Sequence, residues 1–291
     1  MKKSIFFTGV FLFSFAMLQS QVFNLSDQEL INCLHLVIRG NDNSAHYIRP
    51  VILEVENPSE DTISVKIENG LMLMPVQSFY QPVVITRSDF ITLLPGQSAE
   101  KEIFGMCTKA DLVAPESDAL YIAGGFCDPI MQCLTNRIEI DSLHNTEAQL
   151  ALWNLTDDRR LVDIAGFDQE LANDLIHTVA ELTHQDLPPQ PDETDYLRNF
   201  YSTTFRRKMG GVFKCSYRQS CSVSIAMFNK DGVLVRELYN NPSMSPGEHN
   251  LDFAFDATVY TDDYYYVMVI EDGRVSVSLK VNTPKIPDDR G

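Results

Sequence analysis

Six cysteines are the side chains of this sequence whose chemistry depends most on their surroundings. They are Cys33, Cys107, Cys127, Cys133, Cys215 and Cys221. An even number of cysteines in an oxidising compartment predicts disulfides. We expect Cys215 and Cys221 to pair, because they are close together at the start of the last β-rich region; the other four allow several pairings. Zinc is the rival interpretation, but Cys127 and Cys133 do not have the spacing of a zinc knuckle, so we expect no metal site.

Histidines and acidic residues form no recognisable catalytic set. His177 and His184 lie seven positions apart on one predicted helix, and no third metal ligand is evident. Neighbouring acids such as Asp262 and Asp263 do not imply a glycosidase pair, since adjacent residues of a strand face opposite sides. No acidic run matches the twelve-residue calcium loop, although carboxylates at turns leave loop calcium open. We therefore expect no cofactor and a protein that is not an enzyme.

Three consecutive tyrosines, Tyr264, Tyr265 and Tyr266, are the candidate binding residues. In a strand, Tyr264 and Tyr266 share one face and Tyr265 takes the other. One face is expected to be core. An exposed tyrosine ring can stack on a sugar or enter a protein interface at low entropic cost.

The first twenty residues have the pattern of a secretory signal peptide. Lys2 and Lys3 precede an apolar run from Ser4 to Leu18, and Ser20 is a small residue at the expected cut. We therefore expect an exported protein, located in the periplasm, on the outer surface or secreted. No later segment is apolar for long enough to span a bilayer. The net charge is −17, from 40 acidic and 23 basic residues, which argues against nucleic acid as a partner.

Residues 21–142 are predicted to form an N-terminal β-rich domain. Ile63, Val65 and Ile67 alternate with polar residues, as in a strand with one wet face. Turn signals such as Asn69-Gly70 separate further short strands. The segment from Ser26 to Gly40 begins like a capping box and favours a helix, although its alternating apolar residues leave a strand open.

The second half is predicted to contain a helical appendage, a linker and another sandwich. Residues 143–187 have helical spacing and are expected to pack on the first domain. The Pro-rich residues 188–202 are predicted to be a linker. Residues 203–283 contain six or seven short strands, the number expected of a small immunoglobulin-like sandwich, and residues 284–291 a loose tail. The fold class is thus mainly β, with two β-sandwich-like domains and a helical segment between them.

The last block resembles two related bacterial sandwich domains. The similarity rests on Val223–Leu238, Pro246–Leu251 and Tyr264–Val267. It is to the immunoglobulin-like domain of flagellar hook-capping proteins and to the C-terminal domain of proteins exported by the type IX system. This resemblance implies a sandwich fold in the bacterial envelope. The sequence departs from the type IX pattern, because no basic, apolar strand closes the chain.

A shorter resemblance concerns the segment Gln149-Leu150-Ala151-Leu152-Trp153. Thioester domains of bacterial surface adhesins carry a similar Gln-x-Ala-aliphatic-Trp segment, and their glutamine forms an internal thioester with an upstream cysteine. The resemblance implies a thioester between Gln149 and, as the first candidate, Cys107, with Cys127 and Cys133 behind it. The usual Thr before the glutamine is Ala148 here. A helix that buries Leu152 and Trp153 explains the same residues.

Together these features predict an exported, non-enzymatic binding or structural module of a bacterial cell envelope. Its β-sandwich surfaces would be presented to a protein or glycan at the cell surface. Two alternatives stay open: a covalent adhesin with a Cys–Gln thioester, and a hydrolase whose site is assembled from separated residues.

Overall fold

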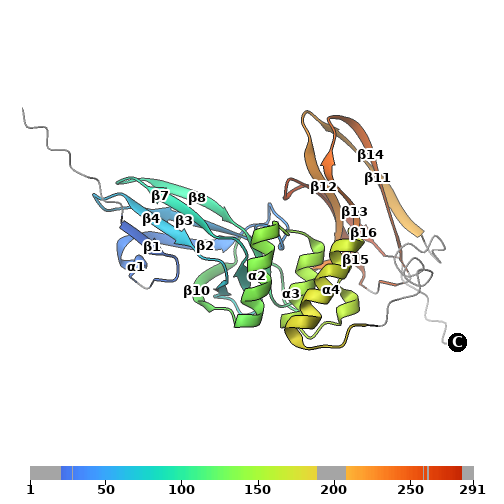
Figure 1. The fold of residues 1–291 in the computed structure, drawn as a ribbon. Helices are drawn as coiled ribbons and strands as arrows, with labels where there is room; N and C mark the ends of the chain where they lie inside the picture. The colour runs from blue at the N-terminus through green and yellow to red at the C-terminus, as the bar shows by residue number, and fades with distance from the viewer. Residues whose placement is uncertain (1–20, 28, 189–207, 258, 261, 284–291) are drawn as a thin grey trace, which may run out of the picture.

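The structure is a computed structural model that describes residues 21–27, 29–188, 208–257, 259–260 and 262–283. The predicted signal peptide, the tail 284–291 and nearly all of the linker 188–202 lie outside the described residues. The fold is mainly β, as predicted. Figure 1 shows two groups of strands at opposite ends of the molecule, with helices α2, α3 and α4 between them.

The N-terminal group is a sandwich of two sheets around a shared core. One sheet has the order β1-β4-β7 and the other the order β8-β3-β2-β10-β5-β6-β9. Ile63, Val65 and Ile67 of β4 point into this N-terminal core, as their alternation predicts. The strands are β1 Gln21–Asn24, β2 His35–Gly40, β3 Val51–Glu56, β4 Ile63–Ile67, β5 Leu71–Pro75, β6 Val83–Ile85, β7 Asp89–Leu93, β8 Ser98–Ile103, β9 Gly105–Cys107 and β10 Leu120–Phe126.

The predicted helix up to Gly40 is wrong. Only Leu30–Cys33 forms a single helical turn, α1, and His35–Gly40 is the strand β2. Strand β2 pairs in register with β3, from His35 opposite Glu56 to Gly40 opposite Val51. The alternating pattern prevails because this pairing satisfies the main-chain groups within the sheet.

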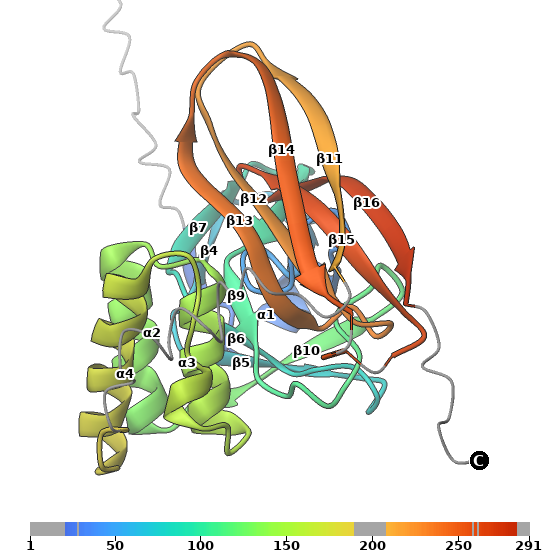
Figure 2. The ribbon, with the colours of Figure 1, turned by 90° about the vertical axis from the view of Figure 1, so that its right-hand side faces the viewer.

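Three helices lie side by side, at the left of the strands in Figure 2: α2 Pro129–Asp141, α3 Thr146–Thr156 and α4 Gln169–Thr183. A short 3-10 turn, η1 Leu161–Asp163, connects the last two. Sequence patterns predict α3 and α4 but not α2. The signal for α2 is local: the Asp128 carboxylate accepts from the main-chain N–H groups of Ile130 and Met131, and Pro129 occupies the first turn.

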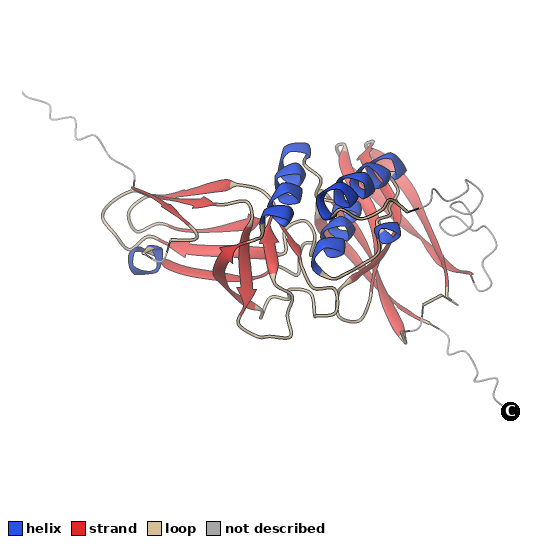
Figure 3. Ribbon diagram, turned by 60° about the horizontal axis from the view of Figure 1, so that its bottom comes forward, coloured by secondary structure: helices blue, strands red, loops and turns tan. Residues whose placement is uncertain are grey.

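Among its described residues the C-terminal group contains six strands, within the predicted number. A two-stranded sheet pairs β11 Lys208–Tyr217 with β14 Gly247–Asp256. The facing sheet has the order β13-β12-β15-β16, formed by Leu234–Met244, Cys221–Phe228, Tyr264–Glu271 and Arg274–Asn282. The apolar side chains between the two sheets form a separate C-terminal core. Seen from below in Figure 3, the helices lie against one end of this sandwich.

All six cysteines are free, so the predicted disulfides are wrong. Cys215 lies on β11 opposite His249, and Cys221 lies on β12 opposite Met244. These strands belong to different sheets, and closeness in sequence does not bring two Cβ atoms to bridging geometry. Cys33 ends α1, Cys107 ends β9, Cys127 follows β10, and Cys133 is exposed on α2.

A third, central core joins the helices to both sandwiches. It contains Trp153 and Leu175 from the helices, Met106 from the N-terminal sandwich, and Phe228 and Ile270 from the C-terminal one. Its members are buried side chains from segments far apart in sequence. The two sandwiches are therefore packed together through the helices rather than merely tethered by a chain segment.

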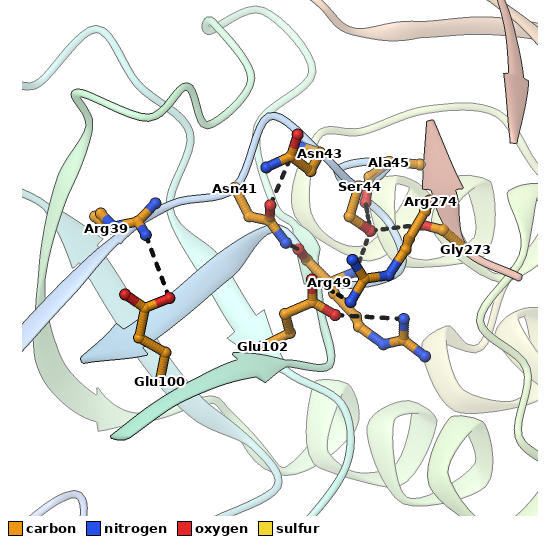
Figure 4. A network of polar contacts seen from close by, with 10 residues as sticks. All are labelled: Arg39, Asn41, Asn43, Ser44, Ala45, Arg49, Glu100, Glu102, Gly273 and Arg274. Atoms are coloured by element: carbon orange, nitrogen blue, oxygen red, sulfur yellow. Dashed lines mark hydrogen bonds and ion pairs between the residues drawn. The ribbon is translucent and has the colours of Figure 1, made fainter. Parts of the chain in front are cut away.

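Polar contacts reinforce this junction at the β15–β16 turn (Figure 4). The Ser44 hydroxyl donates to the Gly273 carbonyl oxygen at 2.8 Å. The Val275 N–H donates to the Asn43 carbonyl oxygen at 3.0 Å. The Glu102 carboxylate lies 3.0 Å from the Arg274 guanidinium and 3.5 Å from that of Arg49. The segment of residues 41–50 therefore holds the C-terminal sandwich by main-chain and charged contacts.

We expect Gly273→Ala to lower the free energy of unfolding by about 1–3 kcal/mol. Gly273 has φ +83°, and an added Cβ would lie 2.9 Å from the Ile48 Cγ2 atom across the junction. Urea unfolding measures the loss. Gly96→Ala is the matched control, since Gly96 has φ +69° but no atom within 4 Å of the added Cβ. Equal losses of unfolding free energy in both variants would show that contact with Ile48 adds nothing to the effect of Gly273→Ala.

Candidate functional site

The side chain of Gln149 is hydrogen-bonded to the main chain of Cys107. The Cys107 N–H donates to Gln149 Oε1 at 3.2 Å, and Gln149 Nε2 donates to the Cys107 carbonyl oxygen at 2.8 Å. Both residues are fully buried. The structure thus brings together the glutamine and the first-choice cysteine of the predicted thioester, which are 42 positions apart.

Local structure explains this placement. Strand β9 is the edge of its sheet, so the outer main-chain groups of Cys107 have no neighbouring strand. Helix α3 begins beside it, where the Asn145 side chain accepts from the Ala148 N–H at 3.0 Å. Gln149 lies in the first turn of α3, and its carboxamide supplies the donor and the acceptor that a further strand would otherwise provide.

Residues of β9 alternate between two cores. The Met106 side chain belongs to the central core and the Cys107 side chain to the N-terminal core. Burial raises the pKa of the Cys107 thiol well above its ordinary value. The thiol is therefore protonated and shielded from solvent. The Gln149 carboxamide contacts the Cys107 main chain from α3, outside the edge of the sheet.

A buried histidine, His46, lies beside Gln149. Its ring stacks on Trp153 with a centroid distance of 5.5 Å, and Nε2 accepts from the main-chain N–H of Leu234 at 3.0 Å. Burial lowers the pKa of His46 to about 3, and the Gln149 side chain opposes this shift as a hydrogen-bond partner. The imidazole is therefore neutral at physiological pH.

A cavity of about 230 Å³ between the two sandwiches reaches His46. Three carboxylates contribute to its wall, those of Asp42, Glu116 and Asp231. Lys230 also contributes and pairs with Asp231 at 2.7 Å. The excess of negative charge favours a cationic group, such as a primary ammonium, in this cavity.

A pair of buried carboxylates, Glu147 and Glu237, lies across the interface between α3 and β13. Glu147 Oε1 accepts from the Asp168 N–H at 3.2 Å, and Glu237 Oε2 accepts from the Phe167 N–H at 3.0 Å. Burial, and then the charge of Glu147, raise the pKa of Glu237 to about 8; burial likewise raises the pKa of Glu147. Sequence reasoning missed this pair, because 90 positions separate residues that only tertiary packing brings together.

The tyrosine triplet is not an open binding surface. Tyr265 is buried in the C-terminal core, and its hydroxyl accepts from the Asp262 N–H at 3.0 Å. This corrects its prediction as a binding residue, while the predicted division of the faces holds. Tyr264 and Tyr266 are half-buried and pack edge to face at 5.7 Å, and the Lys280 ammonium lies 3.5 Å from the Tyr264 ring centroid.

The remaining predicted site residues do not converge. His177 lies on α4, and His184 ends that helix in a left-handed conformation at φ 55°. Within the described part of the chain, no cluster of three histidine, cysteine or acidic side chains could hold a metal ion. The described helices also include none that is long and apolar enough to cross a membrane.

Comparisons with known proteins leave the site to be interpreted from its geometry alone. No protein-family model, curated protein or solved structure matches this chain.

Proposed function

We propose that this chain is an exported, non-enzymatic binding protein of a bacterial cell envelope that attaches covalently to its target. The attaching group is a thioester between Cys107 and Gln149. The observation that supports this proposal is the pair of hydrogen bonds that hold the Gln149 carboxamide against the Cys107 main chain. Among the described residues, Cys107 is the cysteine whose main chain is hydrogen-bonded to the Gln149 side chain.

The chemistry requires no cofactor. The Cys107 Sγ adds to the Gln149 carboxamide carbon, the carbon–nitrogen bond breaks, and the nitrogen leaves as ammonia with the thiol proton. The proposal requires Sγ to turn out of the N-terminal core towards this carbon, by rotation about the Cα–Cβ bond of Cys107. An amine on the target then attacks the thioester, forms an amide with the Gln149 carbonyl carbon, and releases the Cys107 thiol.

Non-covalent binding through the sandwich surfaces to a protein or glycan is the second candidate. It is favoured by the position of the Cys107 side chain in the N-terminal core. In that case the Gln149 carboxamide only completes the edge of the sheet, and its two hydrogen bonds are structural.

Intact mass spectrometry of the exported protein distinguishes the two. We expect a mass one ammonia below that of the mature sequence, restored and extended by addition of methylamine, with the adduct mapped to Gln149. Cys107→Ala and Gln149→Glu are expected to have their full sequence masses and no reaction. Cys133→Ala is the matched control, since Cys133 is exposed on α2, and it should react like the wild type. A full-mass wild-type protein that is inert to methylamine would leave only the non-covalent candidate.

A further inference from the structure

A second cavity at the junction, of about 280 Å³, has a mostly polar wall. It lies between the connection of α2 to α3 on one side and strands β12 and β13 on the other. Among the described residues, Glu237 is the one carboxylate in this wall, and no lysine or arginine contributes to it. In the cavity that reaches His46, by contrast, Lys230 already pairs with Asp231.

The carboxylate of Glu237 is buried next to that of Glu147 without a positive partner. The two residues are 6% and 1% exposed. Glu237 accepts from the Phe167 N–H and from Asn240 Nδ2, both at 3.0 Å, and within the described part of the chain neither carboxylate pairs with a basic side chain. Buried acids are normally paired with a cation, because burying a lone charge is costly. The pair therefore lacks a positive charge, and the cavity is open to Glu237.

The hydroxyl of Tyr47 is buried in the same wall without a hydrogen bond. Tyr47 is 2% exposed, and its oxygen has no partner at hydrogen-bonding geometry among the described residues. Its ring stacks on Phe228 in the central core, with a centroid distance of 6.5 Å. Burial, and then the charges of Glu237 and Glu147, raise the pKa of Tyr47, and the Ser224 side chain opposes this shift. The hydroxyl end of the ring thus faces cavity residues, as a polar group that still needs a partner.

We infer that this cavity binds a primary ammonium group reversibly. Such a group carries one positive charge and three N–H donors. Three acceptors in the wall match these donors: the Glu237 carboxylate, the Tyr47 oxygen and Asn240 Oδ1. The Asn240 oxygen is available because its amide nitrogen donates to Glu237 Oε1. Ile48 and Ile270 supply apolar wall for an alkyl chain behind the ammonium.

A metal ion matches the same wall less well. Ca²⁺ takes about six to eight oxygen ligands and usually several carboxylates, whereas Glu237 is the single carboxylate that the described residues place here. Those residues also contain no group of three histidine, cysteine or acidic side chains that could hold a metal ion. The ammonium needs only three acceptors and one negative charge.

The test is isothermal titration calorimetry of the full exported chain with n-butylammonium chloride. At about pH 9 the amine is protonated, and the pH is above the Glu237 pKa of about 8. We expect saturable binding with a dissociation constant of about 1 mM or lower. Tetramethylammonium has the same charge but no N–H donor, and it should give no saturable binding. Equal binding of both cations would show only a general attraction to an acidic chain and would overturn the site.

Variants place the bound amine in one of the two cavities. Glu237→Gln and Tyr47→Phe each remove an acceptor at nearly constant shape, and we expect either to weaken binding by about 10–100-fold, as for a hydrogen bond to a charged group. Asp42→Asn is the matched control, because Asp42 lines the cavity at His46, and it should bind like the wild type. Binding that is lost in Asp42→Asn and kept in Glu237→Gln would overturn the assignment.

This site is independent of the proposed thioester, since it uses neither Cys107 nor Gln149. Cys107→Ala cannot form a thioester and is expected to bind n-butylammonium with the wild-type affinity. Absence of saturable binding in both Cys107→Ala and the wild type would overturn the ammonium site, whatever the mass of the wild-type protein. A full-mass wild-type protein that binds the amine reversibly would overturn the thioester and support the ammonium site.

Discussion

Replacing Trp153 by alanine is expected to lower the free energy of unfolding by about 3–5 kcal/mol, the cost of removing a fully buried aromatic side chain. Trp153 is the only tryptophan and is completely buried in the central core. Its ring stacks on His46. The guanidinium of Arg159, which lies in the segment between α3 and η1, is 4.9 Å from the centroid of the Trp153 ring. The cavity left by the substitution would lie where the helices meet both sandwiches.

Urea unfolding followed by circular dichroism measures this loss, since the variant has no tryptophan fluorescence. Trp153→Phe should lose less, because it refills part of the volume. Ile140→Ala is the exposed control: Ile140 on α2 is 80% exposed, and its loss should stay within about 0.5 kcal/mol. If Trp153→Ala lowers the free energy of unfolding by less than about 1 kcal/mol, the loss is far below that of a buried aromatic side chain. This result would contradict the central core as described.

The second large effect concerns pH and the carboxylates of Glu237 and Glu147. The folded-state pKa of Glu237, about 8, lies above its ordinary value of 4.5, so the folded state prefers the protonated form. The contribution of Glu237 to the free energy of unfolding is therefore greatest below about pH 4.5. It falls by up to about 1.4 kcal/mol per pH unit as the pH rises towards 8, because only the unfolded chain ionises freely.

Glu237→Gln mimics the protonated carboxyl and is expected to remove most of this pH dependence. The variant should be as stable as the wild type at the acidic end and more stable at the alkaline end of the range. Urea unfolding at several pH values from 4.5 to 8 measures both curves. Glu248→Gln, an exposed acid on β14, is the control and should follow the wild type. Parallel curves for Glu237→Gln and the wild type would show that this carboxylate is already ionised in the folded protein.

Both effects arise at the same junction as the candidate site. Trp153 supports the ring of His46, and Glu147 precedes Gln149 by two positions on α3. A change that separates the C-terminal sandwich from the helices would therefore remove the hydrogen bond from the Leu234 N–H to His46 Nε2. On the proposed function, we expect variants that weaken the junction to change thioester reactivity at Gln149 as well.

Local patterns were sufficient for much of the fold. Alternating residues such as Ile63, Val65 and Ile67 identify strands, because a sheet with one buried face requires a period of two. Helix α4 is evident from its apolar spacing, with Leu175 and Val179 in the core. The segment up to Gly40 was misread because helical and alternating patterns overlap there, and only pairing with β3 decides between them.

Patterns in the sequence predicted the mainly β fold class and six or seven C-terminal strands, of which six are among the described residues. Cys107 was the first of three candidate partners of Gln149, and only a resemblance implied it. Tertiary packing places the Met106 and Cys107 side chains in different cores, and Cys215 and Cys221 on different sheets. It also brings His46 and Glu237 to the junction of the sandwiches. The physical reason is that strand and helix periods are properties of neighbouring residues. Contacts between residues far apart in sequence depend instead on how whole sheets and helices pack.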